Sequence, residues 1–257
     1  MLLLLALASV FAPWLTSAEP GDIDPSQRFL APGAETPFGT DHLGRDMLAL
    51  VLYGGRTSLL VGTLVTVLSM AAAIALGLWA GFYRRVDAVV MRLTDGLLAF
   101  PGVVLATAVS GILGPSVPTV VAALSVVLVA PSLRVVRGQV LVVRELPMIE
   151  AARAVGVPEA RILRRYVLPA LLSPVLVQAS FVFSAAVLGE AALSFIGLGV
   201  GAEDVSWGSA LTEARNYIGN APWMVVFPGL AIVLAILSLN LLGDALRDVL
   251  DPRQGSR

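Results

Sequence analysis

The sequence predicts an all-α integral membrane protein built from six membrane-spanning helices. Of its 257 residues, 57% are hydrophobic and only 14% are charged, and the mean hydropathy is +0.87. A soluble domain carries about 25% charged residues, so this composition indicates a chain that lies largely in lipid. Because lipid offers no hydrogen-bond partners to open backbone groups, the apolar segments are expected to be helices.

Windows free of charged residues define the predicted spans. Residues 57–83 suffice for one crossing, which takes about 20 residues. The window 96–133 is too long for one, and the Gly- and Pro-containing sequence GILGPSVPT at 111–119 predicts a turn that divides it into two spans. The windows 166–189 and 216–243 supply two more, which gives five spans in this part of the chain.

The N-terminal segment, residues 1–18, is expected to be the first span. Its apolar run and the small residues near its end also resemble a cleaved signal peptide, but the positive leading region of such peptides is missing. Residues 19–56 are then expected to form an extracytoplasmic segment. Residues 57–257 would form the core of five spans, with a cytoplasmic loop at 144–169.

The arginines predict the orientation of these spans. The chain has no lysine, and 13 of its 17 arginines fall in the segments 84–92, 134–165 and the C-terminal end, which a six-span topology places on one side. Positive charge concentrates on the cytoplasmic side of membrane proteins. Both termini and the 144–169 loop are therefore expected in the cytoplasm of a multi-pass protein of the inner membrane.

The composition also excludes several functions. With no cysteine and one histidine, thiolate nucleophiles and multi-histidine metal sites are absent from the sequence. Asp41, His42 and Asp46 are the nearest approach to a metal-ligand set, and one imidazole beside exposed carboxylates does not predict a site. The phosphate-binding pattern GxxxxGK[ST] is missing as well, so no catalytic residue, metal or cofactor is assigned to this chain. A membrane enzyme has little to be built from.

The sequence EAARAVGVPEARILRRYVLP at 150–169 is unusually polar for this chain. Glu145–Val155 has the composition of a helix, Gly156 fits its C-terminal cap, and Pro158 fits the first position of a second helix. Arg161, Arg164 and Arg165 share one face of that second helix. From the residues alone, the arginines could either lie on anionic lipid or belong to a docking surface for another protein.

The same stretch resembles the EAA motif of permease subunits in ATP-binding-cassette (ABC) importers. Glu150, Ala151, Ala152 and Gly156 match the motif, Leu168 and Pro169 match its end, and Tyr166 stands where isoleucine is usual. Segments 37–62, 95–106, 189–200, 206–208, 221–234 and 240–253 further resemble the dipeptide, oligopeptide and nickel subfamily, and within it the "C"-type subunit.

The resemblance implies a type I importer permease with a MetI-like core. Its EAA loop, with Arg161 added to the motif residues, would couple this chain to ATPase subunits. The implied partners are a homologous second permease, two ATP-binding-cassette ATPases that hold ATP and Mg, and an extracytoplasmic binding protein. Transport of di- or oligopeptides by alternating access is expected, with nickel, haem or glutathione as alternative cargo and an ATPase-independent secondary transporter as the less favoured mechanism.

Four residues of the 166–189 span and its end are candidates for the translocation pathway or its outer gate. Glu190 is the only charged residue between Tyr166 and Ala202. An ionisable residue in a span suggests function, although its position about 30 Å along the helix equally suggests a structural or binding-protein-contacting role at the outer interface. Gln178, Ser180 and Ser184 would face a wet cavity or pack against neighbouring helices.

Overall fold

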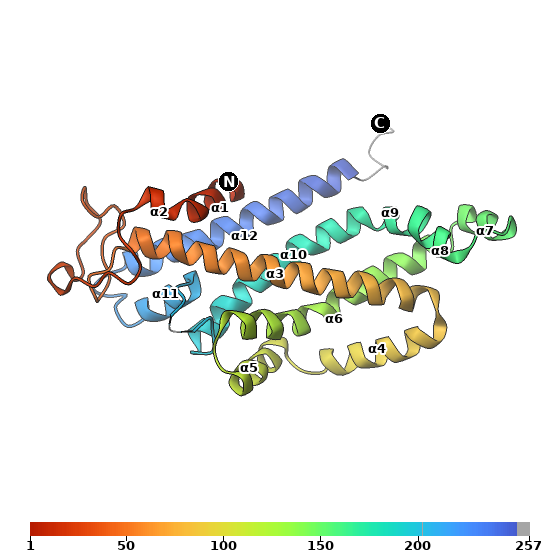
Figure 1. The fold of residues 1–257 in the computed structure, drawn as a ribbon, viewed down its shortest axis with the longest axis horizontal. Helices are drawn as coiled ribbons and strands as arrows, with labels where there is room; N and C mark the ends of the chain where they lie inside the picture. Colours follow the sequence, from red (N-terminus) through yellow and green to blue (C-terminus); the bar gives the residue numbers. More distant parts are fainter. Residues whose placement is uncertain (202, 251–257) are drawn as a thin grey trace. The chain divides into compact units, whose positions relative to one another are not determined.

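The computed structural model describes residues 1–201 and 203–250, with side chains as far as residue 245, and in these ranges every regular element is a helix (Figure 1). The end of the predicted core domain, residues 251–257, lies outside the described residues. The elements are α1 (Leu2–Val10), α2 (Ala12–Leu15), η1 (Pro25–Gln27), α3 (Met47–Phe82), α4 (Arg84–Leu98), α5 (Gly102–Leu113), α6 (Val117–Arg144), α7 (Pro147–Ala154), α8 (Glu159–Ile162), η2 (Leu163–Val167), α9 (Leu168–Ala170), α10 (Leu172–Phe195), α11 (Trp207–Ala214) and α12 (Trp223–Leu250).

Four of the described helices, α3, α6, α10 and α12, are long and apolar enough to cross a membrane, and α4 and α5 add a fifth crossing if they form one span broken at residues 99–101. The turn predicted at 111–119 is confirmed, because α5 ends at Leu113 and α6 begins at Val117. The first 18 residues form two short helices instead of one continuous one. At 1.5 Å per residue the nine residues of α1 rise about 14 Å, less than the roughly 30 Å of hydrocarbon.

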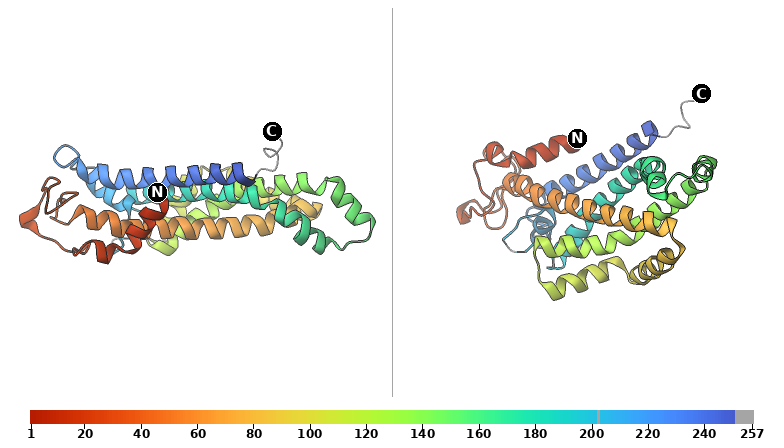
Figure 2. Two further views of the ribbon diagram at one scale, coloured as in Figure 1. Left: turned by 90° about the horizontal axis from the view of Figure 1, so that it is seen from above. Right: turned by 45° about the vertical axis from the view of Figure 1, so that its right-hand side comes forward.

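The arginine-bearing segment 84–92, which lies between two of the charge-free windows, is helical. It belongs to α4, whose chain reverses direction after α3 (Figures 1 and 2). Asp87 of α4 accepts hydrogen bonds from Arg137 of α6, and Asp95 pairs with Arg134 at 2.5 Å. Asp87 in this segment therefore has its partner on α6, a contact that the local sequence pattern does not indicate.

The chain divides into two compact units, and α3, α6, α10 and α12 contribute residues to both. Unit 1 comprises Met1–Leu64, Val103–Leu124 and Phe183–Leu239, and its buried apolar residues surround Trp207 and Met224. Unit 2 comprises Val65–Gly102, Ser125–Val182 and Asn240–Arg257. Its core joins the side chains of α3, α6 and α10 to those of α7 and α8.

Close helix packing in unit 2 depends on two glycines of α3. A Cβ atom on Gly77 would lie 2.8 Å from Cγ1 of Val136, and one on Gly81 would lie 2.7 Å from Cβ of Val140. These glycines are four residues apart and so lie on one face of α3, facing α6. Membrane helices approach closely where small residues line the interface, as they do here.

Replacing Gly81 by leucine is therefore expected to destabilise unit 2 by about 3 kcal/mol, because overpacking forces the backbones apart. Gly138 on α6 is a matched control, since no atom lies within 4 Å of the position its Cβ would take. The measurement is the midpoint of thermal unfolding of the purified protein in detergent. Equal midpoints for the two leucine variants would contradict the assigned packing.

Candidate functional site

Helix α7 holds the first half of the predicted coupling segment with one face buried and the other exposed. Its N-cap is Leu146, and Pro147 takes the first helical position, where a missing N–H costs nothing. Ile149 and Ala152 are buried in the core of unit 2, whereas Glu150 and Ala151 are exposed. Alanine at 152 allows α7 to lie close against that core, and Glu150 faces outward.

Gly156 ends α7 as predicted. Its φ of +79° lies in the left-handed region that favours glycine. Its N–H donates to the carbonyl oxygen of Arg153 at 2.9 Å, and the N–H of Val157 donates to that of Ala152 at 3.0 Å. This pair of bonds is the Schellman motif, which satisfies carbonyl groups at a helix end. The chain direction after α7 is thus set by one glycine.

The second half of the segment continues through α8, a π-helical turn and α9 (Figure 2). Pro158 is the N-cap of α8, whereas the sequence predicted it at the first helical position, so α8 begins one residue later than predicted. Ile162 and Val167 are buried in the same core as Ile149, while Arg161, Leu168 and Pro169 are exposed. The predicted EAA-loop residues are therefore brought into one continuous segment from α7 to α9, in which α7 and α8 form a helix–turn–helix.

Exposed apolar side chains accompany Glu150 on this segment. Val155 is 80% exposed and Met148 is 49% exposed, although both are large hydrophobic residues. Larger exposed apolar patches mark protein-binding sites, and these side chains add apolar exposed area beside the charges of the segment. The segment is thus anchored to unit 2 by one face and exposes the other.

Glu190 lies in unit 1, where it is fully buried and bound by three serine hydroxyls. Ser194 and Ser206 each donate to one of its oxygens at 2.7 Å, and Ser58 of α3 donates to the other at 3.1 Å. Ser58 accepts the backbone N–H of Trp207 at 3.1 Å, and Ser206 accepts that of Ser209 at 3.0 Å. Because both hydroxyls accept these N–H groups, their hydrogens are directed to Glu190.

The Glu190 cluster fixes the start of α11 against α3 and α10. Ser206 and Ser209 also form a reciprocal capping box at that helix start. Gly208 lies so close to α10 that a Cβ there would be 2.6 Å from Cα of Ala191. Sequence reasoning missed the three serines, although Ser194, one turn after Glu190, and the Ser206–Ser209 spacing are local signals that could have indicated them.

Of the other pathway candidates, Ser180 and Gln178 make polar contacts within unit 2. Ser180 is buried and donates to the carbonyl oxygen of Val177 at 2.7 Å. Gln178 is half-buried, and its Nε2 lies 3.4 Å from Oγ of Ser132. Both belong to unit 2, whereas Ser184, which is buried, belongs to unit 1.

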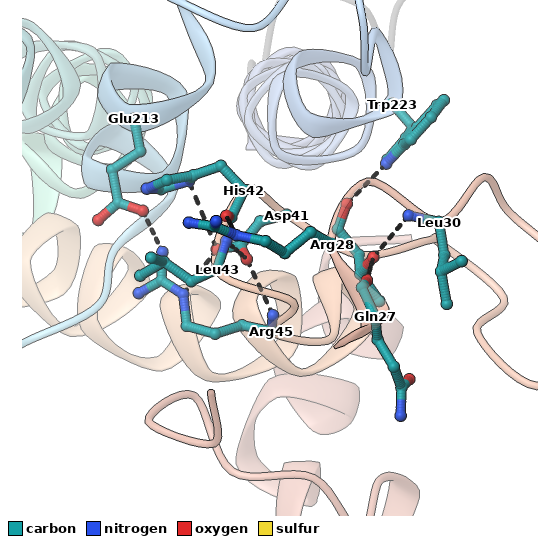
Figure 3. A network of polar contacts seen from close by, with 10 residues as sticks. Gln27, Arg28, Leu30, Asp41, His42, Leu43, Arg45, Glu213 and Trp223 are labelled. Carbon is teal, nitrogen blue, oxygen red and sulfur yellow. Dashed lines mark hydrogen bonds and ion pairs between the residues drawn. The ribbon is translucent and has the colours of Figure 1, made fainter. Parts of the chain in front are cut away.

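A second polar network in unit 1 ties the 27–46 segment to α11 (Figure 3). Arg45 pairs with Asp41 at 2.6 Å and also with Glu213 of α11. Burial lowers the pKa of Arg45, but the carboxylates of Glu213 and Asp41 outweigh burial and hold its pKa above the usual value. The indole N–H of Trp223 donates to the carbonyl oxygen of Thr40 at 2.9 Å.

This network bears on the weak metal-ligand set of the sequence. The structure groups Asp41 and His42 with Glu213, and not with Asp46. Arg45 already bridges Asp41 and Glu213, so a cation at this position would have to displace a guanidinium group. Asp46 instead accepts the backbone N–H of Leu48 at the start of α3. The arrangement therefore fits a network of ion pairs that joins Asp41 and Arg45 to α11 better than it fits a metal site.

The fold defines a polytopic helical membrane protein with an exposed helix–turn–helix between two of its spans. Residues 73–256 match the family described as binding-protein-dependent transport system inner membrane component, and the chain belongs to that family.

Two relatives are similar over almost the whole chain. A peptide transport system permease protein of Brucella suis biovar 1 (strain 1330) is 45% identical over 98% of this chain and 86% of its own length. The dipeptide transport system permease protein DppC of Alkalihalophilus pseudofirmus is 43% identical over 97% of this chain and 83% of its own.

A structure of the MetNI methionine ABC transporter in inward-facing conformations shares the fold. It gives a TM-score of 0.65 at 19% identity, with 80% of this chain and 98% of that chain covered. The MetI-like fold predicted from the sequence is thus confirmed.

Proposed function

We propose that this chain is the transmembrane permease subunit of an ATP-driven importer, which moves di- or oligopeptides across the inner membrane by alternating access. The observation that carries the proposal is the helix–turn–helix at 147–162, anchored on one face and exposed on the other, in a chain of the binding-protein-dependent transport family. Glu150, Ala151 and Gly156 with Arg161 and Pro169 form the exposed coupling surface for an ATPase, Ala152 anchors α7 in the core of unit 2, and Leu168 belongs to the end of the segment.

The core of unit 2 supports a mechanical role for this surface. Ile149 of α7 is fully buried in the same cluster as Val140 of α6 and Leu171, which precedes α10. A force on α7 would therefore reach α6 and α10 through close-packed side chains, which transmit displacement because protein interiors have little free volume. Rigid-body motion of packed helices is one established form of conformational switch.

In the proposed assembly, this chain forms part of the pathway, and other subunits hydrolyse ATP and deliver the cargo. ATP and Mg are held by two partner ATPase subunits, and a homologous permease completes the pathway. An extracytoplasmic binding protein delivers the cargo to the side that carries the 19–56 segment. The arginine distribution supports placing both termini and the coupling segment in the cytoplasm. No catalytic residue is assigned to this chain.

Peptide cargo is supported by the names of the relatives. Proteins named for peptide, dipeptide and di/tripeptide transport match over nearly the full chain. A glutathione transport system permease of Pectobacterium atrosepticum is 42% identical over 84% of this chain and 72% of its own length, which keeps glutathione, itself a peptide, as the alternative. The cargo found on the purified cognate binding protein decides between them.

For the pathway we propose Gln178, Ser180 and Ser184 as polar positions of α10. Glu190 is assigned a structural role near the outer face of the membrane. Its side chain is fully buried and accepts hydrogen bonds from three serines of the same unit. Transport assays of Gln178→Ala with peptides of different length would test the assignment of α10.

Reversing the charge of Glu150 tests the coupling surface. We expect Glu150→Lys to reduce ATPase co-purification and transport about tenfold or more. Reversing the charge at residue 150 would place it against a like charge of the docked partner, which costs several kcal/mol. Glu145→Lys is the control, since Glu145 is exposed and pairs only locally with Arg144 at 2.9 Å. Equal effects of the two substitutions would contradict docking through Glu150, and transport that persists with catalytically inactive ATPases would contradict the importer.

A further inference from the structure

Two adjoining depressions in unit 2 have opposite chemistry. One, of about 560 Å³, is lined by Pro158, Ala160 and the three arginines of the coupling segment, Arg161, Arg164 and Arg165. The other, of about 220 Å³, is mainly apolar and is lined by Leu78, Trp79, Tyr83, Ala160, Leu163, Arg164 and Leu168. Ala160 and Arg164 line both, so the basic depression and the apolar one form a continuous surface.

The basic half carries uncompensated positive charge. Arg161, Arg164 and Arg165 are exposed, and in the described part of the chain none of them lies within ion-pair distance of a carboxylate. Glu159, the acid adjacent in sequence to this group, accepts a hydrogen bond from the hydroxyl of Tyr83 at 3.2 Å. That hydrogen bond raises the pKa of Tyr83.

The apolar half carries aromatic residues at the end of a membrane span. Trp79 is 60% exposed and lies in the last turn of α3, with the ring of Tyr83 at 5.7 Å. Leu168, which lines the same depression, is 40% exposed. Tryptophan and tyrosine are enriched where a helix leaves the hydrocarbon for the headgroup layer, because their rings are amphipathic.

We propose that this joined surface binds one anionic phospholipid, with its phosphate on Arg164 and Arg165 and an acyl chain along Trp79, Leu163 and Leu168. The proposal rests on the proposed function, which places the coupling segment at the cytoplasmic face of the membrane. Basic pockets at that face are suited to acidic headgroups. A free phosphate would leave Trp79 exposed, and an acidic segment of a partner protein would not match the apolar half.

The site gives the bilayer a contact with the coupling segment itself. Arg164 and Arg165 lie in the π-helical turn Leu163–Val167, between the short helix α8 and α9. π-helical turns are rare and occur mostly at functional positions. A lipid bound here would join the end of α3 to the second half of the helix–turn–helix, and would hold the coupling segment at a fixed height on the membrane.

The test measures lipid retention by the assembled transporter, purified with its partner subunits and reconstituted in nanodiscs of mixed phosphatidylglycerol and phosphatidylcholine. Native mass spectrometry counts the lipids that stay bound. We expect Arg164→Ala/Arg165→Ala to weaken phosphatidylglycerol binding about 25-fold, at about fivefold for each arginine near an anionic surface. Arg85→Ala/Arg92→Ala on α4 removes the same charge from exposed positions and is expected to leave retention unchanged.

Two further arms identify the source of the phosphate. Trp79→Ala is expected to lower phosphatidylglycerol retention, and millimolar glycerol phosphate is expected not to displace the lipid, because it lacks the acyl chain. Full displacement by glycerol phosphate, or unchanged retention in Trp79→Ala, would overturn the lipid assignment in favour of a small-anion site.

Loss of ATPase subunits from the Arg164→Ala/Arg165→Ala variant with unchanged lipid retention would overturn the proposal in favour of a protein contact. The lipid readout does not depend on transport. If the lipid-retention test fails while Glu150→Lys behaves as expected, the proposed importer function therefore remains supported.

Discussion

Glu190→Ala is expected to lower the stability of unit 1 more than any other single substitution of a polar residue there. Three hydroxyl groups donate to this fully buried side chain, and its removal leaves three buried donors without an acceptor, at a cost of roughly 1.5 kcal/mol each. The total cost amounts to about 4 kcal/mol, which lowers the midpoint of thermal unfolding by roughly 10 °C for a chain of this size. The measurement is a thermal scan of the purified protein in detergent at fixed rate.

A graded series separates this structural role from a role in transport. Ser194→Ala removes one donor and is expected to show about a third of the effect, and Glu190→Gln keeps an acceptor oxygen and should lie between. Glu203→Ala, an exposed acid in the segment that precedes α11, is the control and should melt like the wild type. An unchanged midpoint in Glu190→Ala together with abolished transport would reject the structural assignment and restore Glu190 as a pathway residue.

Gly156→Pro is expected to abolish ATP-driven transport while the spans still insert. Proline locks φ near −65°, whereas residue 156 adopts +79°, and proline also removes the N–H that donates to Arg153. The Schellman motif cannot form, at a cost of about 3 kcal/mol or more, so α7 ends differently and the coupling surface loses its shape. The measurements are ATPase co-purification and peptide uptake into proteoliposomes.

The control for this prediction uses a non-glycine residue that tolerates the same backbone. Asparagine visits the left-handed region, and no atom lies within 4 Å of the position of a Cβ at residue 156. Gly156→Asn is therefore expected to retain most of the ATPase association. Wild-type ATPase assembly on the proline variant would show that the geometry of this turn does not matter for docking.

The coupling segment could be predicted from the sequence because its conformation follows local rules. Pro147, Gly156 and Pro158 each restrict the backbone at or next to their own position, and the structure places helix starts and a left-handed turn there, with Pro158 displaced by one residue. The span windows followed equally simply from the absence of charge. The contact of Asp87 with Arg137 of α6 could not be predicted in this way, because the two residues are 50 positions apart.

The sequence by itself determined that the chain is a helical membrane protein, where its long spans lie, and which turn-linked helices carry the EAA motif. Hydrophobic windows and the backbone constraints of proline or glycine act over short stretches of the chain. They can therefore be recognised in the sequence without knowledge of the tertiary structure. Only the tertiary structure decided which side chains surround Glu190 and that Trp79 lines a surface with Arg164. Ser58 and Glu190 are 132 positions apart, and hydrogen bonds and shared walls between such distant segments exist only after the helices have packed.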